Sequence, residues 1–165
     1  MRTDFLDALH VLVSHGVEFV LIGGVAANAL GSPSVTTDLD ICYERSDDNL
    51  ERLVTALIAL GARLRGPGVP DSAPFQLHPD TLRAGDSFTF ATRAADLDVL
   101  GTPSGTRGFA ELRANATLMD FGEGLEVWVC SLEDLMRMKT AAGRPKDRIE
   151  LEVLGALRDE LERRD

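Results

Sequence analysis

Two segments whose residue types predict strands carry aspartates at alternating positions. Asp38 and Asp40 lie within 34–44, SVTTDLDICYE, and Asp96 and Asp98 occupy a second such segment, AADLDVL. A strand projects every second side chain from one face, so each pair shares a face, with its Cα atoms roughly 7 Å apart. Carboxylates this close repel unless a cation or a shared proton lies between them. All-oxygen ligands suit Mg²⁺ or Mn²⁺, so the two segments side by side predict a divalent-cation site.

A pair of glycines predicts a second part of the same site. In 20–30, VLIGGVAANAL, an apolar strand runs through Gly23 and Gly24 into a helix of small residues. Glycine lets a ligand approach the backbone, and the free amides of a helix's first turn favour an anion. A cation site beside such an anion-binding turn indicates metal-assisted phosphoryl or nucleotidyl transfer. The purely structural alternatives are a tight turn at the glycines and a charged edge strand at the aspartates.

The order of these motifs resembles a known superfamily. A glycine pair, then D-L-D about fifteen residues later, then a further strand aspartate is similar to the nucleotidyltransferase superfamily that includes DNA polymerase β. The C-terminal 130–154, CSLEDLMRMKTAAGRPKDRIELEVL, resembles the tail of small bacterial nucleotidyltransferases, including toxin–antitoxin and abortive-infection types. Antibiotic-modifying nucleotidyltransferases share the front motif more than the tail. The resemblance runs discontinuously from about residue 17 to residue 154.

The resemblance implies roles for the front residues. Gly23 and Gly24 match the turn that holds the triphosphate, and Asp38 and Asp40 match a metal-binding pair that bridges two cations. Asp98 matches the third carboxylate, which in the family helps to hold one metal and orients or deprotonates the acceptor hydroxyl. Spacing alone does not choose between Asp98 and its neighbour two residues earlier. The family pattern favours Asp98 because a hydrophobic Val-Leu pair follows it directly, which leaves the earlier aspartate at the rim.

The tail supplies positive charge. Lys139, Arg144, Lys146 and Asp147 match the tail motif, and the first three are candidates to neutralise the triphosphate, although surface charge is the structural alternative. One departure concerns Ser34, which stands where many relatives carry arginine, four residues before the first aspartate. The resemblance therefore implies the loss of a phosphate or acceptor contact at this position.

The surrounding pattern predicts an α+β fold, a mixed sheet flanked by helices with a helical C-terminal segment. The chain of 165 residues is predicted to be a single domain, with a core over 1–130 and a helical segment over 131–165. Predicted helices are 4–15, 25–30, 48–60, 108–116, 132–142 and 145–164, and predicted strands are 17–24, 34–44, 87–92, 95–100 and 125–130 with a partner before it. A turn-rich loop is predicted over 65–74, RGPGVPDSAP.

Net charge, the length of apolar runs and the positions of the cysteines exclude several classes of protein. The net charge of −10 argues against a nonspecific grip on a nucleic-acid backbone, which needs a basic surface. No apolar run is long enough to span a membrane, and acids near the N-terminus argue against a signal peptide, so the chain is predicted to be cytoplasmic without a membrane partner. Cys42 and Cys130 fall in predicted strands and are expected to be buried free thiols.

Together these features predict a nucleotidyltransferase that uses Mg²⁺ or Mn²⁺ to transfer a nucleoside monophosphate from a nucleoside triphosphate, such as ATP, to an acceptor hydroxyl, releasing pyrophosphate. A tRNA end, a protein side chain and a small molecule all remain open as acceptor. Two alternatives remain. One is a nucleotide-binding regulator or toxin–antitoxin partner without catalysis, with an antitoxin or other protein bound to it. The other is a metal-dependent phosphodiesterase that uses the same carboxylates with water as the attacking group.

Overall fold

The computed structural model of the chain describes residues 2–66 and 77–165. Its helices are α1 (Thr3–Ser14), α2 (Gly23–Leu30), α3 (Asp47–Ala59), α4 (Pro79–Ala84), α5 (Phe109–Asn115), α6 (Leu132–Ala142) and α7 (Pro145–Arg164). Its strands are β1 (Phe19–Ile22), β2 (Asp38–Tyr43), β3 (Arg63–Leu64), β4 (Ser87–Ala91), β5 (Asp96–Leu100), β6 (Thr117–Asp120) and β7 (Glu126–Val129).

The described strands form one mixed sheet in the order β3-β4-β5-β2-β1-β7-β6. β2 pairs in parallel with β5 and antiparallel with β1, while β1 pairs in parallel with β7. Short connections give the antiparallel pairs β4–β5 and β6–β7. The predicted α+β fold with a mixed sheet and a helical C-terminal segment is therefore confirmed.

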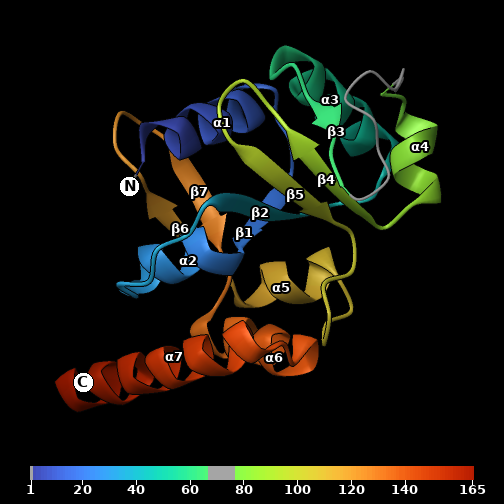
Figure 1. Ribbon diagram of the computed structural model, residues 1–165. Helices are drawn as coiled ribbons and strands as arrows, with labels where there is room; N and C mark the ends of the chain where they lie inside the picture. The colour runs from blue at the N-terminus through green and yellow to red at the C-terminus, as the bar shows by residue number, and fades with distance from the viewer. Residues whose placement is uncertain (1, 67–76) are drawn as a thin grey trace.

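Helices cover both faces of the sheet (Figure 1). Helices α1, α3 and α4 lie on one side, and α2, α5, α6 and α7 lie on the other. β1 is buried on both faces, as expected for a strand at the centre of such a stack. In β2 the side chains of Leu39, Ile41 and Tyr43 are fully buried, which places the alternating aspartates on the opposite face.

Polar residues fix where the helices begin. Ser46 precedes α3 and accepts a hydrogen bond from the backbone N–H of Asn49, and Ser131 does the same for Asp134 ahead of α6. Each serine satisfies an amide that has no partner within its helix. Pro145 occupies the first turn of α7, where its missing N–H costs nothing. These starts agree with the sequence pattern.

Three details differ from the prediction. β1 ends at Ile22, and Gly23 and Gly24 form the first turn of α2 rather than the end of the strand. The short elements β3 and α4 were not predicted. β2 begins at Asp38 and ends at Tyr43, so the first four residues of the predicted strand 34–44 lie outside it. The predicted loop over 65–74 lies outside the described residues from position 67 onward and stays a prediction there. No helix in the described ranges combines the length and the apolar character needed to cross a membrane.

Candidate active site

The parallel pairing of β2 with β5 brings the four strand aspartates together. Asp40 lies opposite Asp98, and Asp38 lies opposite Asp96. Directly opposed residues of paired strands project from the same face. Leu39 is fully buried on the other face, so burial of apolar side chains there fixes which way all four carboxylates point.

Asp40 and Asp98 form a half-buried pair within this cluster. The Asp40 carboxyl shares a hydrogen bond with Asp98, and burial, followed by that hydrogen bond and the nearby negative charges, raises the Asp40 pKa well above its ordinary value. Among the described residues, the Oδ1 atom of Asp98 is one of two buried side-chain polar atoms without a hydrogen-bond partner. Two neighbouring carboxylates with one unsatisfied oxygen between them are a ready pair of ligands for a cation.

Asp38 and Asp96 are more exposed and share a different partner. One guanidinium nitrogen of Arg65, Nη2, lies 3.6 Å from Asp38 Oδ1 and 3.5 Å from Asp96 Oδ2. Within the described part of the chain, no three Asp, Glu, His or Cys side chains are already gathered as a metal site. The Asp40–Asp98 pair and the Arg65 ion pairs therefore divide the four carboxylates into two groups.

The two glycines are required by the side chains that pack on them. A Cβ on Gly23 would lie 2.1 Å from Oδ2 of Asp40, and the residue has a φ of +69°, which favours glycine. A Cβ on Gly24 would lie 2.6 Å from the hydroxyl oxygen of Thr36. The glycine pair thus lets α2 begin directly against the carboxylates of β2.

Positive charge reaches the site from the C-terminal helices. The fully buried Asp147 in the first turn of α7 accepts hydrogen bonds from Arg144: from its backbone N–H at 3.0 Å, from Nε at 2.7 Å and from Nη2 at 3.2 Å. Lys139 Nζ lies 3.4 Å from Asp147 and also pairs with Glu150. The Arg144 hydrogen bonds are the main reason why the pKa of Asp147 falls to about 2. Asp147 therefore holds two cations at the edge of the site.

These groups line one cavity of about 270 Å³. The described residues around it are Gly24, Ala27, Ser32, Ser34, Val35, Thr36, Thr37, Asp38, Asp40, Asp98, Lys139, Arg144, Lys146, Glu150 and Leu154. Gly23 borders a neighbouring cavity together with Asp40, Lys139 and Arg144. The structure therefore brings seven of the eight predicted site residues to one cavity and places the eighth, Gly23, at the cavity beside it.

Known structures share this arrangement of elements. A lincosamide antibiotic adenylyltransferase, LnuA, in its lincomycin-bound form, superposes with a TM-score of 0.63 at 12% identity, over 95% of this chain and 98% of that one. The chain has the nucleotidyltransferase fold. The antibiotic-resistance factor ANT(2'')-Ia matches at a TM-score of 0.56 in a solution structure, with 16% identity over 98% of this chain and 91% of that one. Its crystal structure in complex with adenylyl-2''-tobramycin also matches at 0.56, with 14% identity over 99% of both chains.

The remaining comparisons add no family. No protein-family model and no curated protein matches the chain. At identities of 12–16%, the structural likeness establishes the fold and leaves the reaction to be argued from the site. The nucleotidyltransferase fold predicted from the order of the motifs is confirmed.

Several residues of this nucleotidyltransferase fold were not singled out in the sequence. Thr36 precedes Asp38 by two positions within the predicted strand 34–44, so alternation in the sequence indicated the same face, although β2 itself begins at Asp38. Glu150 follows Lys146 by four positions in α7, a spacing that puts both on one side of a helix. Arg65 carried no such signal, because its place beside Asp38 depends on how β3 packs at the edge of the sheet.

Proposed function

We propose that the chain is a nucleotidyltransferase that moves a nucleoside monophosphate from a nucleoside triphosphate to an acceptor hydroxyl. The observation that carries this proposal is the half-buried Asp40–Asp98 pair, with its buried unsatisfied oxygen, lining the same cavity as Lys139, Arg144 and Lys146. Carboxylates on one wall and cations on another suit a ligand that is itself a metal–polyphosphate complex.

The carboxylates have distinct proposed roles. Asp40 and Asp98, with Asp38 when it leaves Arg65, would hold Mg²⁺ or Mn²⁺, whose charge would stabilise the phosphates during transfer. The acceptor oxygen forms a bond to the α-phosphorus while the bond to the bridging oxygen breaks, and pyrophosphate leaves with that electron pair. Asp98 takes the proton of the acceptor hydroxyl.

The cations and the glycine turn have proposed binding roles. Lys139, Arg144 and Lys146 neutralise the triphosphate, and the backbone amides of Gly24, which lines the same cavity, and of Gly23, which lines the neighbouring one, bind its phosphates. The LnuA neighbour is an adenylyltransferase, and the ANT(2'')-Ia complex contains an adenylylated antibiotic. We therefore propose ATP as the nucleotide and a hydroxyl group of a small molecule as the acceptor.

Calorimetric titration with each of the four nucleoside triphosphates, with and without Mg²⁺, tests this proposal without knowledge of the acceptor. We expect Mg²⁺-dependent binding of ATP that is lost in Asp40→Asn and kept in Asp159→Asn. Asp159 lies on α7 with 61% of its side chain exposed, pairs with the exposed Arg158 at 3.8 Å, and is not among the described residues that line the cavity, so its substitution removes one charge outside the site. Wild-type protein that is folded yet binds none of the four nucleotides would rule the proposal out.

A second candidate is nucleotide binding without transfer. It is favoured by the ion pair of Asp38 with Arg65 at 3.6 Å, which must break before Asp38 can bind a metal. In this case ATP binds and the protein never releases pyrophosphate, with or without a pool of acceptors. A coupled pyrophosphate assay on the same samples separates the two candidates.

A further inference from the structure

Arg65 is the cation of this site that the transfer chemistry leaves unexplained. It follows β3 at the edge of the sheet, where its backbone N–H donates to the carbonyl of Thr89 on β4 at 2.9 Å. From there its guanidinium reaches over to Asp96 of β5 and Asp38 of β2. Thr89 lies opposite Asp98 on β5. Arg65, Thr89 and Asp98 therefore lie side by side in a row across the sheet.

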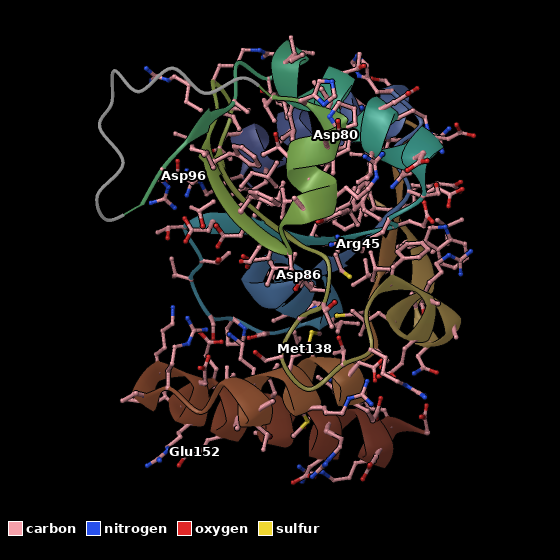
Figure 2. The ribbon with its side chains drawn as sticks, turned by 90° about the vertical axis from the view of Figure 1, so that its right-hand side faces the viewer. Arg45, Asp80, Asp86, Asp96, Met138 and Glu152 are labelled. Atoms are coloured by element: carbon pink, nitrogen blue, oxygen red, sulfur yellow. The ribbon has the colours of Figure 1, made fainter. Side chains whose placement is uncertain are left out.

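The position of Arg65 sets it apart from the other cations. Lys139 lies on α6, Lys146 lies on α7, and Arg144 lies between the two helices; all three line the cavity. Arg65 is not among the described residues that line it. Figure 2 shows Asp96, one partner of Arg65, well separated from α6 and α7, which carry the labelled Met138 and Glu152. The carboxylates therefore lie between two groups of positive charge.

In-line transfer assigns these two groups to different ligands. The attacking acceptor oxygen and the leaving pyrophosphate lie on opposite sides of the α-phosphorus. With the phosphates against the cations of α6 and α7, the acceptor approaches over β5, β4 and β3, where Arg65 lies. This step rests on the proposed function.

We propose that Arg65 selects an acceptor that carries an oxyanion, a phosphate or a carboxylate, close to the hydroxyl that is modified. When a divalent cation takes Asp38, the guanidinium keeps Asp96 and loses its second carboxylate partner. A guanidinium offers five N–H donors in a planar fork that matches an oxyanion in two places. An acceptor that carries an amine at this point is repelled by Arg65 and by the bound metal.

Four small molecules that share a 1,2-diol unit, and are called diols here for that reason, differ in the group attached to it and test the proposal: glycerol, glycerate, glycerol 3-phosphate and 3-amino-1,2-propanediol. Each is titrated by ligand-observed NMR into protein already loaded with Mg²⁺ and a non-hydrolysable ATP analogue. We expect glycerate or glycerol 3-phosphate to bind more tightly than glycerol, and the better of the two identifies the oxyanion. The aminodiol binds most weakly.

Substitutions locate the effect. Arg65→Ala weakens binding of the anionic diol by about tenfold or more, the loss expected for a hydrogen bond to a charged group. Arg65→Lys keeps the charge but lacks the planar fork of donors, so its affinity for the anionic diol lies between that of the wild type and that of Arg65→Ala. The control is Arg93→Ala, because Arg93 is exposed and its side chain donates a hydrogen bond to the backbone carbonyl of Ala59 at 3.2 Å, away from the four aspartates.

Three outcomes overturn the proposal. Equal binding of all four diols, tightest binding of the aminodiol, or unchanged binding of the anionic diol in Arg65→Ala would show that Arg65 merely neutralises Asp38 and Asp96. Wild-type protein that fails to take up Mg²⁺ and the ATP analogue would overturn the proposed function, and this inference with it. A failure confined to the diol titrations overturns this inference alone.

Discussion

Asp147 is the carboxylate that pairs with Arg144 and Lys139 where α6 meets α7. Removing its charge tests how much these ion pairs stabilise the folded protein. Asp147 is fully buried and bound by Arg144 and Lys139. Folding lowers its pKa from an ordinary 3.8 to about 2. At about 1.4 kcal/mol per pH unit, the ionised carboxylate contributes about 2 kcal/mol to the free energy of unfolding at neutral pH. We expect Asp147→Asn to lose that amount at pH 7.

The pH dependence gives this prediction its sign. Because the pKa is lower in the folded state, the contribution is complete above pH 3.8 and disappears as the pH falls toward 2. The difference in unfolding free energy between wild type and Asp147→Asn is therefore expected to shrink from about 2 kcal/mol at pH 7 to about 1 kcal/mol near pH 3.

Urea denaturation followed by circular dichroism at pH 7, 5 and 3 measures this difference directly. Asp159→Asn on the exposed side of α7 is the control and is expected to change stability by less than about 0.5 kcal/mol. A gap between wild type and Asp147→Asn that is equally large at pH 7 and pH 3 would refute the reasoning. It would show that the loss comes from packing or neutral hydrogen bonds rather than from the charge.

Two further predictions concern the glycine turn and the thiols. Gly23→Ala is expected to cost about 1–2 kcal/mol for its left-handed backbone and about 1–3 kcal/mol more for the collision with Asp40, and to abolish metal–nucleotide binding. Gly61→Ala, with a φ of +62° and nothing within 4 Å of the added Cβ, isolates the backbone cost in urea denaturation; equal losses at the two positions would contradict the packing against Asp40. Burial raises the pKa of Cys42 and Cys130 to about 12, so iodoacetamide at pH 8 should modify neither thiol until the protein unfolds, as read by mass spectrometry.

The parts of the fold that follow local rules could be predicted from the sequence. Strand alternation placed Asp38 and Asp40 on one face because the apolar residues between and after them had to be buried on the other. Serine and proline at helix starts set the boundaries of α3, α6 and α7 because their preferences depend on only a few neighbouring residues.

The parts that depend on distant packing could not be predicted. β3 has only two residues and exists because β4 offers it a free edge, which no local pattern records. The same packing brings Arg65 to Asp38 across intervening strands. The tail motif indicated cations at Lys139 and Arg144, but their pairing with a buried Asp147 requires α6 and α7 to lie against each other, and a single sequence does not show that contact.

The division of the cavity between sheet and C-terminal helices has a consequence for how the protein is made. Translation releases the carboxylates of Asp38, Asp40 and Asp98 from the ribosome before Lys139, Arg144 and Lys146 have been synthesised. The sheet can form early, but until α6 and α7 have been added, the acidic cluster lacks the cations that line the finished cavity. A nascent or prematurely terminated chain that ends before α6 therefore lacks the three cationic side chains to which triphosphate binding is assigned in the proposed function. Translation through α7 completes the site.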